Sequence, residues 1–385
     1  MHKKNLTHIA IMTTSFPGGE PGSEAAGSFV EDFAQELSKH VTVTIVAPSK
    51  LMRSDEKYDN LTISRFEVPR LPLSLLEPAN LLHWPLIFKT LRAGMYALER
   101  VTTESRIDHI LALWVLPSGY WARRLWKKRG IPYSVWALGS DIWILGKIPL
   151  VKNILKGVIS DSSICFADGF TLKRDVEKIS GKSCEYLAST RTLPTIKRKQ
   201  VSMIPPYRLA YLGRWHTNKG IDLLIEGLQL LCNDDWKLIK EVRICGGGPL
   251  AEMVKLGCDR LHFVNRPLTL MGYLNKKEVA ELFLWADYVL LPSRMESIPV
   301  VFSDAIQSEC PVIAMPVGDI PYLVSKYKVG ILSKEVSSKA FSAAIREAML
   351  KPPCTYIDGL VAIKRQFDLS LAVDRFMSFL TEGKR

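Results

Sequence analysis

Residues 212–222 read LGRWHTNKGID, and the interpretation of the second half of the chain starts from this stretch. The strand-like run Arg208–Leu212 leads into it, and the helical pattern Asp222–Leu231 follows it. Arg214 offers a planar fork that suits phosphate oxygens, whereas Lys219 supplies a compact point charge. Because only a turn separates them, the two cations can address one diphosphate. The alternative is a solvated basic loop without a ligand.

Two further loops share this strand-to-helix setting. Residues 243–250 read RICGGGPL; glycines at a strand end let the backbone approach a ligand closely, and Pro249 suits the first turn of a helix. Residues 292–305 read PSRMESIPVVFSDA and place Glu296 in a loop and Asp304 on the helix that follows. Amides around Ile298–Val301 are free donors at a helix start, which predicts an anion site. A plain tight turn and a chance pair of acids are the alternatives.

Outward from these loops, short apolar runs alternate with amphipathic helical patterns. Expected strands are Ile9–Thr14, Val43–Ala47, Ile110–Val115, Tyr133–Leu138 and Ile164–Phe166, then Arg208–Leu212, Val242–Cys245, Leu261–Val264, Tyr288–Leu291, Val312–Met315 and Gly330–Leu332. Expected helices are Phe29–Leu37, Gly119–Lys128, Asp222–Leu231, Lys277–Phe283, Ala340–Leu350 and Leu371–Leu380. This alternation predicts an α/β chain with two doubly wound parallel sheets.

The chain of 385 residues is long enough for two domains at roughly 150 residues each. Between Ala188 and Tyr207 the sequence becomes polar, basic and rich in proline, which predicts a linker. We therefore expect an N-terminal domain over residues 1–200 and a C-terminal domain over residues 204–365. A C-terminal helix at about residues 366–385 is expected to pack back on the first domain.

Composition narrows the choice of partners and compartment. The net charge of +12 favours anionic partners, although a soluble protein can also simply be basic. Seven cysteines without a Cys-x-x-Cys pair predict reduced thiols in a reducing compartment. The run Ile9–Met12 is too short for a signal peptide and predicts a buried strand. The richest apolar stretch, Leu71–Ala97, is interrupted by prolines and polar residues, so we expect no spanning helix.

The three loops, in this order, resemble the donor-binding half of family 4 glycosyltransferases, which have the GT-B fold. The resemblance extends through residues 263–274, 286–287 and 316–321. The first half resembles the family more loosely, at residues 14–17, 27–30, 113–119 and 139–141. The implied fold is two Rossmann-like domains that face each other across a cleft. The resemblance implies that the N-terminal domain lies on the acceptor side and that the C-terminal domain binds the nucleotide sugar. The implied reaction is transfer of a hexose-type sugar from a nucleotide sugar with retention of anomeric configuration.

The resemblance also implies roles for single residues. Arg214 and Lys219 would hold the diphosphate and stabilise the leaving nucleotide in place of a metal, and Glu296 would lie near the donor sugar; these three are the expected catalytic residues. The expected donor-binding residues are Gly27, Gly139, Asp141, Gly247, Tyr273, Leu274, Ser297, Ile298, Pro299, Val300 and Asp304.

Two positions depart from the family pattern. Asp304, expected at the ribose hydroxyls, is one methylene shorter than the usual glutamate, so contact would need a closer backbone or a water. Leu138 stands where many relatives carry a histidine that faces the donor sugar. The nearby histidines His109 and His216 do not match that position, and we expect structural roles for both.

The implied partners are a UDP- or GDP-sugar donor and a saccharide or polyprenol-linked acceptor, with no cofactor and no metal. The basic charge favours peripheral contact with an anionic membrane at the cytoplasmic face of a bacterial inner membrane, during synthesis of a surface polysaccharide. Tyr120–Arg129 and Leu71–Trp84 are the candidate contact segments. An ordinary surface helix and an ordered acceptor loop are the alternatives.

Three other functions compete with this interpretation. A non-catalytic nucleotide-sugar-binding protein would explain the departures at Leu138 and Asp304. A nucleic-acid-binding protein needs aromatic residues interleaved with cations, which only Tyr120–Arg129 resembles, and it leaves the three loops unexplained. A GT-B epimerase or phosphorylase is the third; the phosphorylase needs a lysine for pyridoxal phosphate in a matching context, which the sequence does not offer.

Overall fold

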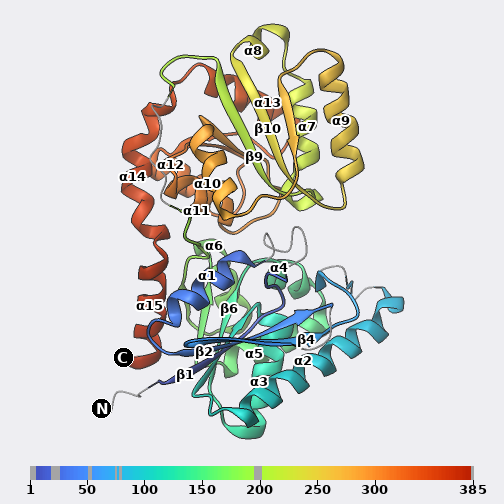
Figure 1. The fold of residues 1–385 in the computed structure, drawn as a ribbon, viewed down its shortest axis with the longest axis vertical. Helices are drawn as coiled ribbons and strands as arrows, with labels where there is room; N and C mark the ends of the chain where they lie inside the picture. The colour runs from blue at the N-terminus through green and yellow to red at the C-terminus, as the bar shows by residue number, and fades with distance from the viewer. Residues whose placement is uncertain are drawn as a thin grey trace. The chain divides into compact units, whose positions relative to one another are not determined.

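The computed structural model describes residues 6–18, 27–50, 54–73, 76–77, 80–194 and 202–382. The chain divides into two compact units: unit 1 comprises Met1–Ala188 and Leu369–Arg385, and unit 2 comprises Ser189–Asp368. Each unit is a mainly parallel β-sheet with helices on both faces, so the predicted fold class is confirmed (Figure 1). The basic segment Lys197–Lys199 of the expected linker lies outside the described residues.

The sheet of unit 1 has eight strands in the order β3-β4-β2-β1-β5-β6-β7-β8. Neighbouring strands are parallel except for the β3–β4 hairpin at one edge. The order reverses between β1 and β5, which is the switch point of this sheet. The strands are β1 (His8–Met12), β2 (Thr42–Ser49), β3 (Asp55–Tyr58), β4 (Leu61–Glu67), β5 (His109–Leu113), β6 (Tyr133–Ala137), β7 (Ile164–Ala167) and β8 (Cys184–Tyr186).

Helices α2, α3, α5 and α6 share one core with the unit 1 sheet, and α1 packs on α15. The helix α1 forms because Phe29, Phe33 and Leu37 recur every four residues and are all buried. The helices are α1 (Ser28–Leu37), α2 (Trp84–Glu104), α3 (Tyr120–Arg129), α4 (Ser140–Trp143), α5 (Pro149–Asp161), α6 (Phe170–Ser180) and α15 (Leu369–Glu382).

Helix α3 is the first candidate for membrane contact, and the structure shows an ordinary surface helix. Trp121, Ala122 and Leu125 are fully buried in the core. Two of its cations bind acids of unit 1: Arg123 donates to Asp161 at 2.7 Å and Lys128 to Glu99 at 2.8 Å. The apolar face of α3 therefore covers the sheet. Within the described residues, no helix has the length and apolar character needed to cross a bilayer.

The sheet of unit 2 has six parallel strands in the order β11-β10-β9-β12-β13-β14. Numbered along this unit, the order is 3-2-1-4-5-6, that of dinucleotide-binding sheets, with the switch point between β9 and β12. The strands are β9 (Tyr207–Arg214), β10 (Ile239–Gly247), β11 (Leu268–Met271), β12 (Tyr288–Leu291), β13 (Val312–Ala314) and β14 (Gly330–Leu332).

Two sets of helices pack around the unit 2 sheet. Helix α7 packs on α9 and α13, and α14 packs on α11 and α12. Figure 1 shows the two sets on opposite faces of the sheet. The helices are α7 (Ile221–Gln229), α8 (Asn233–Lys237), α9 (Ala251–Phe263), α10 (Lys276–Trp285), α11 (Val300–Gln307), α12 (Ile320–Tyr327), α13 (Ser338–Met349) and α14 (Ile357–Lys364).

One predicted strand is wrong. Leu261–Val264 contains the end of helix α9, and the strand follows at Leu268–Met271. Val254, Cys258 and Leu261 bury one face of this helix, whereas Phe263 is 88% exposed. A short apolar run fits a strand or a helix end equally well, and here the helical spacing decides.

The boundary between the units lies between Ala188 and Ser189, at the start of the expected linker. Ser189–Pro194 belong to unit 2 because buried polar contacts attach them to it. The Thr190 hydroxyl donates to the carbonyl of Phe367 at 2.8 Å, and the Gln307 amide donates to Thr190 Oγ1 at 3.0 Å. The C-terminal helix likewise begins at Leu369, after a short 3₁₀ turn over Arg365–Phe367.

Asp141, at the start of α4, joins two loops of unit 1. Its carboxylate accepts hydrogen bonds from the backbone of Val115 at 2.7 Å and of Leu138 at 3.3 Å, so it ties together the segments that follow β5 and β6. The residue is 2% exposed. Burial raises the pKa of Asp141 from 3.8 to about 6, and the backbone hydrogen bonds offset only part of this effect.

This raised pKa predicts a pH-dependent contribution of Asp141 to stability. The folded state binds the proton more tightly, so the contribution is full below about pH 4 and is lost as the pH rises through about 6. In Asp141→Asn the side chain stays neutral. The free energy of unfolding of wild type, minus that of the variant, should therefore increase as the pH falls from 7 to 4. Urea unfolding at five pH values measures this difference, and a constant difference contradicts the raised pKa.

Phe376 of α15 should hold unit 1 together. Its fully buried ring lies 5.5 Å from that of Phe33 and 5.6 Å from that of Phe166. Phe376→Ala should lower the free energy of unfolding by about 3–5 kcal/mol, because it leaves a cavity between α15, α1 and the sheet. Leu371→Ala on the same helix, at a side chain that is 38% exposed, should cost less than about 1 kcal/mol. Equal losses in urea titrations would contradict this role of Phe376.

Candidate functional site

Four predicted residues lie at one edge of the unit 2 sheet. Because its strands are parallel, their carboxyl ends meet there. Arg214 ends β9, Gly247 ends β10, Tyr273 follows β11 and Glu296 follows β12. Ligands of open α/β sheets bind at this edge, at the switch point between β9 and β12. The topology therefore gathers the three loops that the sequence singled out.

The loop after β9 is fixed on both sides. On one side, the amide of Trp215 donates to the carbonyl of Gly247 at 2.7 Å. On the other, Gly220 has φ of +66°, and a Cβ atom there would lie 1.8 Å from the carbonyl oxygen of Pro292. Only glycine allows this approach, so the turn that carries Lys219 rests directly on the loop after β12.

Lys219 and Glu296, two of the three expected catalytic residues, form an ion pair across the switch point. The Lys219 side chain is 40% exposed and that of Glu296 15%. Both line a pocket of about 280 Å³, which includes space open to solvent. The ends of β9 and β12 form its walls, through Gly213, Pro292 and Ser293, and Pro299 at the start of α11 completes it. Arg214 ends the strand beside this pocket and is not among the residues that line it.

The basic loop carries a positive electrostatic potential. Burial lowers the pKa of His216, and the charges of Arg214 and Lys219 lower it further. His216 also caps the 3₁₀ turn Thr217–Lys219, because its Nδ1 accepts from the amide of Asn218 at 3.2 Å. Its structural role is in line with the expectation. His109 likewise bonds Ser134 Oγ at 2.8 Å inside the core of unit 1.

Arg294 braces this loop, a role that the sequence analysis missed. Its guanidinium donates to both carboxylate oxygens of Asp222 at 2.6 Å, and to the carbonyl of Thr217 at 2.8 Å. Its own amide donates to the carbonyl of Asn218 at 2.8 Å. Burial alone would raise the pKa of Asp222, but the hydrogen bonds and charge of Arg294 outweigh burial and lower it. Arg294 therefore fixes the loop after β9 to the loop after β12.

The four expected donor-binding residues after Glu296 form the entry to α11. Ser297 and Ile298 are each 4% exposed, Pro299 is the N-cap and Val300 begins the helix. The amide of Asp319 donates to the carbonyl of Ser297 at 3.2 Å, which fixes this loop from the β13 side. The hydroxyl of Ser297 is a buried polar atom without a hydrogen-bond partner within the described part of the chain. A ligand or a water can supply the hydrogen-bond partner that this hydroxyl lacks.

Tyr273 and Leu274 lie beside the glycine loop. The ring of Tyr273 packs on Gly247, where an added Cβ would lie 2.7 Å from it. Tyr273 is 41% exposed, and Leu274 is half-buried. An exposed aromatic face at the strand-end edge is a surface on which a nucleotide base can stack.

Asp304 differs from expectation. Its carboxylate has no exposed surface and receives the guanidinium of Arg191: Nη2 to Oδ2 at 2.7 Å, and Nε to both oxygens at 3.1 Å. A ribose hydroxyl would reach this carboxylate only if Arg191 moved away. The shorter aspartate side chain keeps the acid inside α11, where Arg191 and not solvent neutralises it.

The remaining expected residues belong to unit 1, whereas the pocket belongs to unit 2. Gly27 precedes α1 with φ of +78°, and a Cβ there would lie 2.3 Å from the carbonyl oxygen of Ser15. Gly139 and the buried Asp141 follow β6, together with the half-buried Leu138. Gly27 thus lies at the end of β1, beside the switch point of its own sheet.

Comparison with known proteins agrees with this geometry. The family model described as "Glycosyl transferases group 1" matches residues 194–356. A putative teichuronic acid biosynthesis glycosyltransferase of Bacillus subtilis, TuaC, is 27% identical over 276 residues, which cover 68% of this chain and 67% of the relative.

Solved structures share the fold over nearly the whole chain. Sucrose-phosphate synthase from Thermosynechococcus elongatus superposes with a TM-score of 0.76 at 14% identity, over 98% of each chain. Anabaena Alr3699/HepE in complex with UDP-glucose has a TM-score of 0.69 at 13% identity, over 97% of this chain and 99% of that one. The match to the group 1 glycosyl transferases thus covers residues 194–356, whereas the likeness in fold, that of the GT-B class, covers the chain as a whole.

Proposed function

We propose that the protein is a retaining, metal-independent hexosyltransferase of family 4. It moves a sugar from a UDP- or GDP-sugar to a saccharide or polyprenol-linked acceptor in the synthesis of a surface polysaccharide. The observation that carries the proposal is the ion pair of Lys219 and Glu296 in the pocket at the unit 2 switch point. The bound UDP-glucose of the Anabaena neighbour and the name of the B. subtilis relative support the donor and the pathway class.

The pocket and the sheet edge beside it offer complementary groups for the two ends of a nucleotide sugar. In this proposal the diphosphate lies against Lys219 and Arg214, whose charges neutralise it without a metal. Glu296, which Lys219 releases to bind phosphate, then accepts hydrogen bonds from the sugar hydroxyls. The exposed ring of Tyr273 lies at the same edge and is available to the base.

The chemical step consists of leaving-group stabilisation and positioning. The bond between the anomeric carbon and the diphosphate oxygen breaks, and the acceptor hydroxyl attacks from the same face, which retains the configuration. Charge that develops on the leaving diphosphate is stabilised by Lys219 and Arg214. The proton of the acceptor hydroxyl passes to the leaving phosphate oxygen, so no separate base is required.

The cellular setting follows from the acceptor. A polyprenol-linked saccharide lies in a membrane, and nucleotide sugars are cytoplasmic. We therefore place the protein at the cytoplasmic face of the inner membrane, in peripheral contact with anionic lipid. The net charge of +12 favours this contact.

If the protein uses a UDP- or GDP-sugar as donor, that donor should stabilise the folded protein, and loss of a pocket residue should slow turnover. From a panel of UDP-, GDP- and ADP-sugars, a UDP- or GDP-sugar should raise the melting temperature, because a ligand that binds the folded state stabilises it. Lys219→Ala and Glu296→Ala should each lower turnover at least about a hundredfold, on the scale of losing one transition-state donor. Transfer is measured by release of nucleoside diphosphate.

Lys334→Ala is a matched control, because Lys334 is an exposed lysine of the same unit and is not among the residues that line the pocket. Near-normal turnover in both pocket variants refutes the assignment. Donor binding without transfer to any lipid-linked or free saccharide favours instead the non-catalytic sugar-nucleotide-binding protein.

Arg294 should act on the donor through the loop it braces. Arg294→Lys keeps the charge but removes the two-pronged contact with Asp222. Lys219 then loses its fixed position, and kcat/KM for the donor should fall about ten- to a hundredfold. Calorimetric titration with the nucleoside diphosphate measures the accompanying loss of affinity.

Arg346→Lys is the control for Arg294→Lys. Arg346 binds Asp235 at 2.8 Å in the same unit, and neither residue lines the pocket. Both variants should lose similar stability, but only Arg294→Lys should lose donor affinity. If the two variants bind the diphosphate equally well, Arg294 has no positioning role.

A further inference from the structure

The start of helix α2 carries an exposed apolar surface that the proposed reaction does not use. Leu81 and Leu82, in the 3₁₀ turn before α2, are 77% and 84% exposed. On the first turns of α2, Trp84 and Phe88 are 45% and 60% exposed, and their rings lie edge to face 5.9 Å apart. Contiguous exposed apolar groups of this size mark interaction surfaces.

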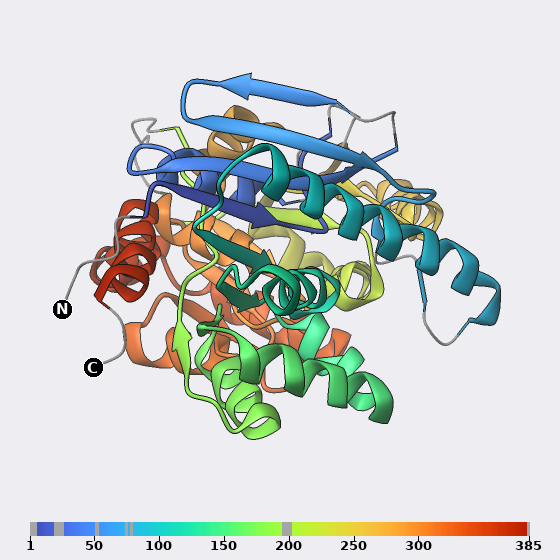
Figure 2. The ribbon, with the colours of Figure 1, turned by 90° about the horizontal axis from the view of Figure 1, so that it is seen from below.

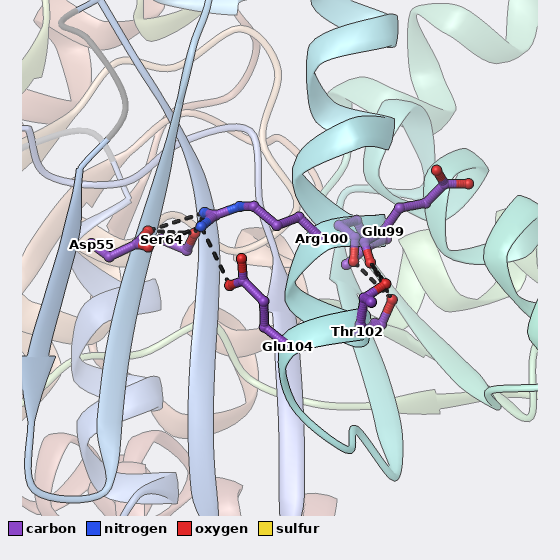
Figure 3. Close-up of polar contacts among 8 residues, drawn as sticks. Asp55, Ser64, Glu99, Arg100, Thr102 and Glu104 are labelled. Carbon is purple, nitrogen blue, oxygen red and sulfur yellow. Dashed lines mark hydrogen bonds and ion pairs between the residues drawn. The ribbon is translucent and has the colours of Figure 1, made fainter.

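The second half of α2 is anchored, so the exposed half is held in place. Arg100 reaches from α2 to the β3–β4 hairpin, where its guanidinium donates to both carboxylate oxygens of Asp55 at 2.9 and 3.1 Å and also to Ser64 (Figure 3). The indole of Trp121 donates to the carbonyl of Leu91 at 2.9 Å. Figures 1 and 2 show the first turns of α2 extending beyond the sheet of unit 1. The apolar side chains are therefore presented on a rigid support.

The start of α5 repeats the pattern. Leu150 is 79% exposed and Ile154 41%. Both α2 and α5 connect parallel strands and contribute to the same core, so they cover the same face of the sheet. Helices in such crossovers run opposite to the strands, which places both helix starts at the carboxyl edge, where α/β sheets bind ligands.

The charge around these side chains is mainly positive. Residues 80–98 and 142–160 contain no aspartate or glutamate. They contain five exposed cations, namely Lys89, Arg92, Lys147, Lys152 and Lys156. Exposed leucine and aromatic side chains bordered by lysine and arginine match the boundary between lipid headgroups and acyl chains, where burial of apolar groups and attraction to anionic headgroups act together. One exposed acid, Glu77, lies beside this border, where its amide donates to Nδ1 of His83.

We propose that these helix starts form a docking surface for an anionic lipid bilayer. The docking surface consists of Leu81, Leu82, Trp84, Phe88, Leu150 and Ile154, with the five cations above. The leucines and Phe88 enter the acyl boundary, and the cations bind lipid phosphates. The proposal rests on the proposed function in one respect: it brings the strand-end edge of unit 1 to the membrane that would hold a polyprenol-linked acceptor. It differs from the α3 interpretation, because α3 buries its apolar face. It includes the end of the other candidate segment, Leu71–Trp84, and extends from there along α2 and to α5.

The test measures vesicle binding without donor or acceptor, so that it is independent of transfer. Wild type should co-sediment with vesicles of phosphatidylglycerol and phosphatidylcholine, and much less with phosphatidylcholine alone. Leu81→Ser/Leu82→Ser/Phe88→Ser should weaken binding at least about tenfold. Lys89→Glu/Arg92→Glu should weaken it at least about twentyfold at low salt, from about fivefold for each cation lost.

Controls come from unit 2. Leu256→Ser/Phe263→Ser removes side chains that are 61% and 88% exposed on α9, and Lys334→Glu/Lys339→Glu reverses two exposed lysines. Both controls should bind vesicles like wild type. Unchanged melting temperature and unchanged stabilisation by nucleoside diphosphate show that each variant is folded.

Several outcomes overturn the docking surface. The first is equal binding of wild type to neutral and anionic vesicles. The second is an equal loss of vesicle binding in the docking variants and the control variants. The third is that the docking variants change self-association, measured by sedimentation, and leave vesicle binding unchanged. If vesicle binding behaves as expected but no sugar is transferred, the docking surface stands and the proposed function fails. If sugar is transferred to a soluble acceptor but the protein does not bind vesicles, the proposed function stands and the docking surface fails.

Discussion

The site in unit 2 depends on one close approach, the contact of Gly220 with the carbonyl of Pro292. It joins the first and fourth strands of the sheet at the point where strand order reverses, and a side chain at residue 220 would separate them. With the two loops in contact, Arg294 can reach Asp222 and Lys219 can reach Glu296. The charged groups of the pocket are thus positioned by backbone packing, before any ligand contributes.

Elements with a strong local signal could be predicted from the sequence. Tyr288–Leu291 and Gly330–Leu332 are short apolar runs between polar segments, and both are strands as expected. The strand Asp55–Tyr58 was missed because its side chains are mostly polar and exposed; it exists only by pairing with β4. The strand predicted at Leu261–Val264 was wrong because four residues are too few to distinguish the period of a helix from that of a strand. Local pattern also missed elements with buried faces: the strand Leu61–Glu67 and the helix Trp84–Glu104 were not among the expected elements.

In the site, too, some residues could be predicted from the local sequence and others could not. Lys219 and Glu296 were found because each lies in a loop between strand and helix, and parallel strands must bring such loops to one edge. Nothing in the sequence relates Arg294 to Asp222, or Arg191 to Asp304, which are far apart along the chain. The positions of these pairs follow from tertiary packing. Sequence therefore indicates which residues a ligand can meet, whereas the residues that hold them in place emerge only from the fold.

The pair of Arg191 and Asp304 affects how activity data at this position can be interpreted. Both side chains are buried, and removal of one partner leaves an uncompensated charge that costs about 3–5 kcal/mol. Asp304 lies in α11, the helix that begins at the pocket, and Arg191 lies where the chain enters unit 2. A variant of Asp304 would disturb both places at once. Loss of activity in such a variant would therefore not identify a ribose contact, because loss of the ion pair with Arg191 alone accounts for it.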